Sequence, residues 1–268
     1  MTNFQDYIKS VRSQGRYYFT GEEALAELKI SPNALYSGIY KLRKKGDIVS
    51  PAKNLYIIVP PEHQSMGCIP AEELVPILMK HWNLDYYASL LTAALYHGAS
   101  HQKPQVFQMM VSKQIKPLMC GRIKIEFLYK KNLNALPTQN KIVKTGYLKI
   151  STPELTMMDL FLYPYRAGGL NNIATVLSEL IEATNIKELL KLASLISQKA
   201  WIQRLGYTLQ HIDPIEIEKR DELIHALRDY IAHQSINFIA LNPNLPLKGM
   251  KRNKIWKIIE NTTIESDE

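Results

Sequence analysis

The chain has 268 residues, of which 46% are hydrophobic, and this length and composition favour two domains with substantial cores over one. No apolar run approaches the ~18 residues of a transmembrane helix, and residues 1–15 lack the apolar region of a signal peptide. We therefore expect a cytoplasmic protein with no membrane partner, in which Cys68 and Cys120 stay reduced. The formal net charge of +8 suggests an anionic partner such as DNA or RNA.

The first 60 residues predict three helices followed by a β-hairpin. Apolar residues recur at helical spacing within 3–14, and a capping box of Thr20 and Glu23 starts a second helix. Residues 48–50 and 54–59 are rich in β-branched and aromatic side chains on either side of a short turn, which predicts a hairpin. This order is that of a winged helix-turn-helix, which places its recognition helix in the DNA major groove.

The third helix carries the residues that we expect to contact DNA. It should begin at Ser31, an N-cap followed by proline, and should end near Lys45, just before a glycine. At about 100° per residue its leucine and isoleucine side chains fall on one side and leave a polar, cationic face opposite. We predict DNA contacts from Ser31, Asn33, Tyr36, Ser37, Tyr40, Lys41, Arg43, Lys44 and Lys45, and from Lys53 at the hairpin tip.

Within this set, the side chains of Asn33, Ser37 and Tyr40 are expected to contact base edges, whereas the lysine and arginine side chains contact phosphates. The alternative is a small helical subdomain whose charged face is simply solvated. We favour DNA binding because a capped helix pair followed by a basic hairpin is a more specific pattern than a run of charges.

The remainder predicts a larger α+β domain at 71–262, preceded by a linker at 61–70 and followed by a mobile acidic tail at 263–268. Ser151 and Glu154 have the spacing of a capping box for one of its helices. The predicted fold class is α+β, an N-terminal winged helix-turn-helix followed by a larger mixed α/β domain. Helices are predicted over 71–81, 85–97, 151–163, 171–183, 186–196, 198–207 and 215–233, and strands over 106–112, 123–129, 146–150 and at both ends of 236–261.

A second basic block lies at residues 91–150, where ten Lys and Arg residues accompany a single acid, Glu126. An anionic partner would explain this block as an extension of the DNA contact surface, and the alternative is a solvated sheet edge guarded by lysines. The accessory nucleic-acid contacts predicted from the block are Lys103, Lys113, Lys116, Arg122 and Lys124.

Catalytic and metal-binding patterns are weak. His97 and His101 have metal-ligand spacing, but a glycine interrupts their helix and no third ligand is evident, so hydrogen bonding at the helix end is favoured. Glu154 and Asp159 fit a helix cap and a packing contact better than an acid–base pair. The GxxxxGK[ST], GxGxxG, GxSxG and CxxC motifs are all absent. We therefore predict no catalytic residue, metal or cofactor, although scattered site residues keep an enzyme as an alternative.

The order and spacing of several segments resemble the AbiEi antitoxins, the antitoxin half of the AbiE toxin–antitoxin and phage abortive-infection systems. The segments that carry the resemblance are 17–25 (YYFTGEEAL), 42–67 (LRKKGDIVSPAKNLYIIVPPEHQSMG), 86–111 (YYASLLTAALYHGASHQKPQVFQMMV), 146–180 (GYLKISTPELTMMDLFLYPYRAGGLNNIATVLSEL) and 241–261 (LNPNLPLKGMKRNKIWKIIEN).

The resemblance implies a two-domain protein whose winged helix-turn-helix binds operator DNA and represses its own operon. We expect two copies of the chain to bind an inverted repeat near the promoter. The family's DNA-contacting helix corresponds here to residues 31–45. A larger C-terminal domain would counter a nucleotidyltransferase toxin encoded alongside, as a type IV antitoxin that needs no stable complex with it, although direct contact stays open. The alternatives are a winged-helix regulator that senses a small ligand, and an RNA-binding protein that uses residues 91–150.

Overall fold

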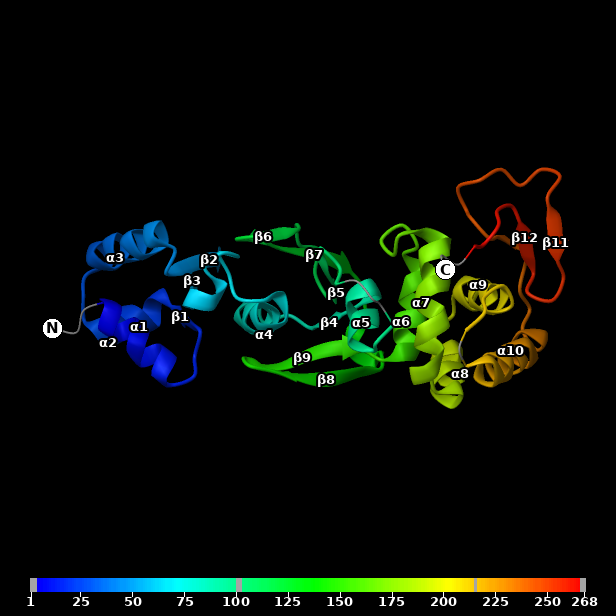
Figure 1. Ribbon diagram of the computed structural model, residues 1–268, viewed down its shortest axis with the longest axis horizontal. Helices are drawn as coiled ribbons and strands as arrows, with labels where there is room; N and C mark the ends of the chain where they lie inside the picture. Colours follow the sequence, from blue (N-terminus) through cyan, green and yellow to red (C-terminus); the bar gives the residue numbers. More distant parts are fainter. Residues whose placement is uncertain (1–3, 100–102, 215, 266–268) are drawn as a thin grey trace. The chain divides into compact units, whose positions relative to one another are not determined.

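The structure is a computed structural model that describes residues 4–99, 103–214 and 216–265. These residues form a mixed α+β fold with three separate sheets, as the sequence predicts for the fold class (Figure 1). The chain divides into two compact units. The first unit comprises Met1–Tyr87, Gln105–Leu133 and Asn140–Lys149, and the second comprises Ala88–Pro104, Asn134–Gln139 and Ile150–Glu268.

The first unit begins with three helices and a three-stranded antiparallel sheet of order β1-β3-β2. The predicted helices and hairpin are confirmed, whereas the three-residue strand β1 was not predicted because so short a strand has no measurable periodicity. The elements are α1 (Phe4–Ser13), β1 (Tyr18–Thr20), α2 (Gly21–Leu28), α3 (Pro32–Lys45), β2 (Ile48–Ala52) and β3 (Leu55–Ile58).

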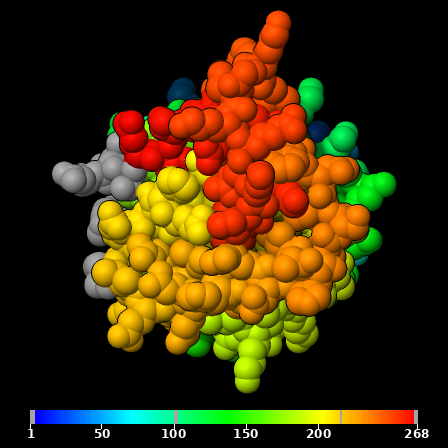
Figure 2. Space-filling view, turned by 90° about the vertical axis from the view of Figure 1, so that its right-hand side faces the viewer, coloured from blue at the N-terminus to red at the C-terminus, as the bar shows by residue number. Residues whose placement is uncertain are grey.

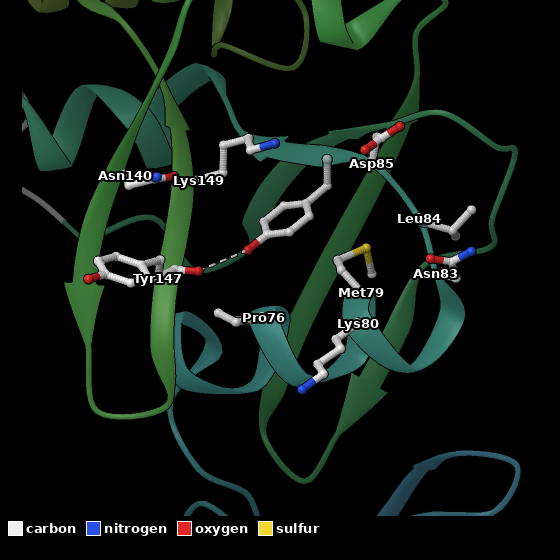
Figure 3. A pocket seen from close by; sticks show the side chains of 10 residues that line it. Pro76, Met79, Lys80, Asn83, Leu84, Asp85, Asn140, Tyr147 and Lys149 are labelled. Carbon is white, nitrogen blue, oxygen red and sulfur yellow. Dashed lines mark hydrogen bonds between the residues drawn. The ribbon is translucent and has the colours of Figure 1, made fainter.

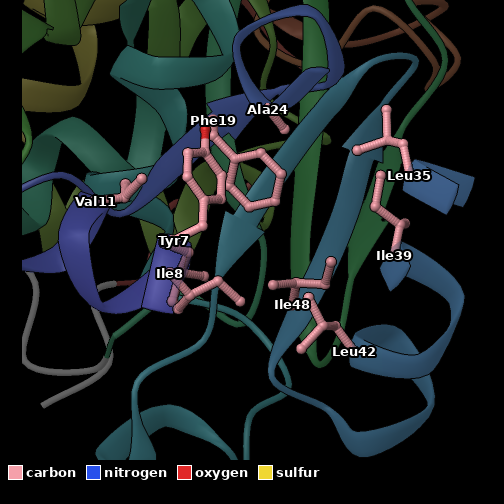
Figure 4. Packing of buried hydrophobic residues seen from close by; sticks show 10 residues of the cluster. Tyr7, Ile8, Val11, Phe19, Ala24, Leu35, Ile39, Leu42 and Ile48 are labelled. Carbon is pink, nitrogen blue, oxygen red and sulfur yellow. The ribbon is translucent and has the colours of Figure 1, made fainter. Parts of the chain in front are cut away.

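Apolar side chains from all three helices and the sheet form one core (Figure 4). The rings of Tyr7 and Phe19 lie edge to face with centroids 5.3 Å apart, and both side chains are almost completely buried. Leu35, Ile39 and Leu42 bring the apolar side of α3 into the same core. The core therefore fixes which face of α3 remains in solvent.

A six-stranded sheet of order β6-β7-β5-β4-β9-β8 follows in the chain. The pair β5–β7 is parallel and the pair β6–β7 is antiparallel. The elements of this part are η1 (Pro61–His63), α4 (Ala71–Trp82), β4 (Tyr86–Ala88), β5 (Phe107–Val111), β6 (Leu118–Cys120), β7 (Ile123–Tyr129), η2 (Leu133–Ala135), β8 (Thr138–Val143) and β9 (Gly146–Ser151).

The helix predicted over 85–97 is wrong at its start. Residues 86–88 form β4, and α5 begins only at Leu90. Tyr87 and Ala88 are fully buried, and Ala88 pairs in parallel with Ile150 of β9. A fully buried strand is continuously apolar, so its pattern cannot be told from that of a buried helix.

The second unit is mostly helical and ends in a small sheet of order β10-β12-β11. Trp201 and Trp256 are its largest fully buried side chains. The C-terminal segments, yellow to red, cover the face of this unit seen in Figure 2. Its elements are α5 (Leu90–Tyr96), α6 (Pro153–Leu162), α7 (Gly169–Ala183), α8 (Ile186–Leu195), α9 (Ala200–Leu209), α10 (Ile217–Ala232), β10 (Ile239–Ala240), β11 (Lys251–Asn253) and β12 (Ile258–Glu260).

The capping box predicted for α6 is also wrong. Thr152 is the N-cap, and its hydroxyl oxygen accepts a hydrogen bond from the Leu155 N–H at 3.4 Å. Ser151 belongs to β9, and the Glu154 carboxylate accepts a bond from the Asn185 N–H at 2.6 Å, at the start of α8. Tertiary contacts have overridden the local spacing signal.

Candidate nucleic-acid interface

The helix α3 is closed at both ends by local interactions that its sequence predicts. The Ser31 hydroxyl oxygen accepts a hydrogen bond from the Ala34 N–H at 3.2 Å, and Pro32 occupies the first helical position. At the other end, Gly46 has φ of 80°, and its N–H donates to the carbonyls of Leu42 and Arg43. The helix is therefore a complete four-turn rod with fixed ends.

The predicted DNA-contacting residues are all exposed, and all belong to the first unit. Tyr36 and Tyr40 are 74% and 61% exposed although both are large aromatic residues. One helical turn apart, they stand next to each other on the surface of α3. Exposed residues on or next to α3 further include Ser31, Asn33, Ser37, Lys41, Arg43, Lys44 and Lys45, and Lys53 is exposed in the hairpin turn.

Two hydrogen bonds hold the hairpin turn that carries Lys53. The Gly21 N–H donates to the side-chain carbonyl of Asn54 at 2.9 Å, which ties the turn to the start of α2. Nε2 of His81, on α4, lies 3.0 Å from the Lys53 carbonyl oxygen. Asn54 has φ of 61°, a conformation that asparagine tolerates in two-residue hairpin turns. The turn therefore sits in a fixed position from which Lys53 reaches solvent.

A cavity of about 340 Å³ adjoins the C-terminal end of α3. Arg43 and Lys45 line one side, and Gln64 and Gly67 line another. The β6–β7 hairpin is attached at this point, because the Arg122 N–H donates to the Met66 carbonyl at 2.8 Å. This contact places the β6–β7 hairpin, which carries Arg122 and Lys124, near the basic end of α3.

Close backbone packing fixes the same junction. A Cβ on Gly121 would collide with the backbone of Met66 and Gly67, so only glycine fits there. Beside it the buried sulfurs of Cys68 and Cys120 lie 2.8 Å apart as free thiols. The hydrogen bond with the Cys120 thiol is the main cause that raises the pKa of Cys68 above its ordinary value of 9.0, and burial of the thiol is the second.

Four of the five predicted accessory residues are exposed in the first unit, in or just before the β6–β7 hairpin: Lys113, Lys116, Arg122 and Lys124. Lys103 is exposed as well, but it belongs to the second unit. The structure therefore gathers four of these residues with α3 into one compact unit.

A polar hollow of about 520 Å³ lies between α4 and the β8–β9 pair (Figure 3). Lys80, Asn83 and Lys149 are among its lining residues, over a floor that includes Met79. The Tyr86 hydroxyl donates to the Tyr147 carbonyl across it at 3.4 Å, and burial raises the pKa of Tyr86 above its ordinary value. Lys80, which lines the hollow, directly precedes His81, and His81 is the α4 residue that contacts the hairpin turn.

The described member of the histidine pair, His97, makes a hydrogen bond at the end of its helix. Nε2 of His97 lies 2.8 Å from the Ser151 carbonyl, which is the helix-end hydrogen bonding that the sequence favours. His101 lies outside the described residues. Across the described parts of the chain, no three His, Cys, Asp or Glu side chains gather as metal ligands. Among those same residues, no helix combines the length and apolarity that crossing a membrane requires.

Sequence reasoning missed two residues that position this surface. Asn54 and His81 hold the hairpin turn, yet their partners lie 33 and 28 residues away in the chain. The turn was predicted at residues 51–53, whereas β2 continues to Ala52 and the turn lies at Lys53 and Asn54. Asparagine favours positive φ in such turns, and this signal could have located it. No sequence pattern identified the tertiary partners of that turn.

Comparison with known proteins identifies both the matched domain and the fold. A model of the AbiEi antitoxin C-terminal domain matches residues 87–211. The crystal structure of the RV2827C protein from Mycobacterium tuberculosis has a similar fold, with a TM-score of 0.67 and 14% identity over 94% of this chain and 89% of that chain. The crystal structure of an antigenic nucleotidyltransferase-like protein from Paracoccidioides brasiliensis covers 59% of this chain and 90% of that chain at 11% identity. Its TM-score of 0.33 is too low to indicate a shared fold. No curated protein matches the chain in sequence.

Proposed function

The chain belongs to the AbiEi antitoxin family, and on this premise we propose that it neutralises a nucleotidyltransferase toxin and represses its own operon. In this proposal it acts in the cytoplasm as a type IV antitoxin of an AbiE-type abortive-infection system directed against phage. The proposal assigns the chain no catalytic residue, no metal and no cofactor.

One observation carries the DNA-binding part of the proposal, namely the exposed face of α3. Its apolar side is buried in the core, while its opposite side presents hydroxyl, amide and cationic groups. Such groups can hydrogen-bond base edges and phosphate oxygens in a major groove. The exposure of Tyr36 and Tyr40 further supports a partner, because two neighbouring aromatic rings in water are costly to leave uncovered.

We assign roles on this face by chemistry. Asn33, Ser37 and Tyr40 contact bases, and the cationic side chains of α3 contact phosphates together with Lys53 of the hairpin turn. Ser31 already caps the helix, so only its hydroxyl proton is available for a phosphate. Two copies of the chain, each with α3 in a major groove, would bind an inverted repeat at the operon promoter.

The β6–β7 hairpin would extend this contact surface along the duplex. Its anchor at Met66 places Arg122 and Lys124 in the unit that also carries α3. Further lysine contacts of this kind would add to the affinity without adding sequence specificity. The alternative, that these lysines only protect a sheet edge, predicts no change in operator affinity when they are removed.

Antitoxicity is assigned to the domain that matches the family model, which spans residues 87–211. A Lys41→Ala/Lys44→Ala double variant should then lose operon repression and still protect cells from the toxin encoded beside it. Repression is measured with a promoter reporter, and protection is measured as survival on toxin co-expression. Loss of both at an unchanged protein level would contradict this division of labour.

A second candidate function is a ligand-sensing regulator without a toxin partner. The hollow of Figure 3 favours it, because α4 lines that hollow at Lys80 and holds the hairpin turn through His81. The neighbouring gene separates the two functions. A nucleotidyltransferase gene supports the antitoxin, whereas a metabolic or transport gene supports the sensor.

A further inference from the structure

The first unit holds Cys68 and Cys120, the two cysteines of the whole chain, side by side in its interior. Both side chains are buried, and their Sγ atoms lie 2.8 Å apart. Because the sulfurs of a disulfide are about 2.05 Å apart, closing one here would move them by less than about 1 Å. The fold therefore keeps these two reduced thiols, here named the cysteine pair, in a position from which they can be joined.

The backbone beside the cysteine pair holds its two segments together. Gly67 directly precedes one cysteine and Gly121 directly follows the other, and the two glycines are in close contact, since a Cβ on Gly121 would lie 2.9 Å from Cα of Gly67. The Arg122 N–H also donates to the Met66 carbonyl at 2.8 Å. The approach of the two sulfurs is therefore set by packing of the main chain as well as by the side chains themselves.

The cysteine pair lies where the three-helix part of the first unit meets the six-stranded sheet. Cys68 belongs to the segment between η1 and α4, which leads from one part to the other, and Cys120 ends the edge strand β6. The same strand contacts β2 of the hairpin that carries Lys53. A bond between the two sulfurs would join these parts across a separation of 52 residues in the chain.

Two other uses of the cysteine pair fit the structure less well. A structural zinc ion takes four ligands, and the described residues offer no group of three His, Cys, Asp or Glu side chains that includes the pair. A bulky disulfide reagent cannot reach buried sulfurs. The cavity of about 340 Å³ at the end of α3 does extend to Gly67, the chain neighbour of Cys68. A small oxidant such as hydrogen peroxide therefore suits this site best.

We propose that Cys68 and Cys120 form an oxidation site, at which a peroxide closes an intramolecular disulfide that clamps the two parts of the first unit together. The inference goes beyond the proposed function and does not depend on it. The raised pKa of Cys68 disfavours its thiolate, so Cys120 is assigned the attack on the peroxide and Cys68 the second step.

The reaction has two balanced steps. The Cys120 thiolate attacks one peroxide oxygen, the O–O bond breaks, and a sulfenic acid forms while the departing hydroxide takes up a proton and becomes water. The Cys68 sulfur then displaces the sulfenic hydroxyl, which leaves with the Cys68 proton as a second water, and the S–S bond forms. The two sulfurs together lose two electrons, and the peroxide is reduced to two waters.

The disulfide should make the folded chain more resistant to unfolding. It would close a loop of 52 residues and so reduce the conformational freedom of the unfolded chain. Little native strain opposes this gain, because the two sulfurs are already in contact. The site would therefore stabilise the protein when the peroxide concentration rises, and reduction of the disulfide would reverse the effect.

The test treats the full-length chain with hydrogen peroxide and measures its mass and its melting temperature. We expect a monomer lighter by two hydrogen atoms, a proteolytic peptide that joins Cys68 to Cys120, and a melting temperature higher by at least about 5 °C. Dithiothreitol should reverse all three changes. Glutathione disulfide should oxidise the pair at least about tenfold more slowly, because the sulfurs are buried.

Cysteine variants provide the controls. Peroxide also oxidises methionine, of which the chain has nine, and Cys68→Ala/Cys120→Ala treated in the same way measures that contribution. Cys68→Ala should accumulate a sulfenic acid at Cys120 that dimedone labels, whereas Cys120→Ala should give no such label. Each variant is compared with its own untreated sample, so the cost of replacing a buried thiol cancels.

Three results would overturn the proposal. Two free thiols after a treatment that has oxidised the methionines would show that peroxide does not reach the pair. A disulfide between two chains, or sulfinic acids on unlinked cysteines, would exclude the intramolecular reaction. An intramolecular disulfide that leaves the melting temperature unchanged would remove the clamp.

Discussion

The ring of Phe4 in α1 occupies the space that a side chain at position 38 of α3 would need. A Cβ on Gly38 would lie 2.5 Å from Cε2 of Phe4, well inside van der Waals contact. Glycine at this position therefore allows α1 to pack directly on the middle of α3. The packing orients the helix, and the orientation decides which of its side chains are exposed for the proposed contact with DNA.

The substitution Gly38→Ala should lower the free energy of unfolding by about 1–3 kcal/mol, because the ring of Phe4 or the whole of α1 must shift. Operator affinity should fall with it as α3 tilts. Urea unfolding and fluorescence anisotropy measure the two effects. Phe4→Ala combined with Gly38→Ala removes the collision, so the double variant should be more stable than the sum of the single changes predicts. Strictly additive changes would show that the two residues are not coupled.

The turn that carries Lys53 should depend on Asn54 in two separable ways. Asn54→Gly keeps the positive φ and loses the hydrogen bond to the Gly21 N–H, which should cost about 0.5–1.5 kcal/mol. Asn54→Ala adds the strain of a positive φ and should cost more than the glycine variant. Chemical denaturation of the two variants tests this order, and a glycine variant less stable than the alanine variant would contradict it.

The two classes of α3 contact should respond differently to sequence changes in the operator. Asn33→Ala and Ser37→Ala should each reduce discrimination against a substituted base pair by about 1–3 kcal/mol. Lys44→Ala should weaken binding to all sequences alike. Anisotropy titrations against a panel of single-base operator variants measure this, with Lys187→Ala as a control on the second unit. Equal losses from all three α3 substitutions on every duplex would remove the base-contact assignment.

Stability should fall above about pH 9, because Cys68 and Tyr7 both have raised pKa values in the folded chain. Burial, with Glu23 and Glu27 nearby, raises the pKa of Tyr7 from 10.0 to about 12. For both residues the stabilisation is fully present below the unfolded pKa and is lost as pH rises toward the folded pKa. For Tyr7 this window is therefore pH 10 to 12.

The measurement is urea unfolding in reductant at about pH 8 and about pH 11. Tyr7→Phe and Cys68→Ala should each flatten the fall in stability between these two conditions, whatever they cost in packing. If the two side chains contribute only by packing, the variants will instead lose as much stability between these pH values as the unsubstituted chain, and this result would contradict the prediction.

Local signals predicted the ends and the buried side of α3 well. Ser31, Pro32 and Gly46 set the ends of α3, and the helical spacing of its apolar residues identified the buried side. These signals succeed because caps and amphipathic spacing act within one or two turns of the chain.

Features that depend on tertiary contacts escaped prediction. The strand at Tyr87 was taken for helix because its burial on both faces removed any alternation. The cap of α6 moved to Thr152 because Glu154 binds the start of α8 instead. The anchor of the hairpin turn at His81 joins segments that lie 28 residues apart in the chain, which no local pattern encodes.

The most direct test of the central claim is the salt dependence of operator binding, measured by fluorescence anisotropy on the full-length chain. If the face of α3, Lys53 and the β6–β7 hairpin together engage about six to ten phosphates, affinity should fall by ~10³ to 10⁵ between about 50 and 200 mM salt. The Lys41→Ala/Lys44→Ala variant should bind more weakly and show a shallower slope, reduced by about two. An affinity that does not change with salt, or a double variant that binds like the unsubstituted chain, would contradict the assignment of α3 to DNA.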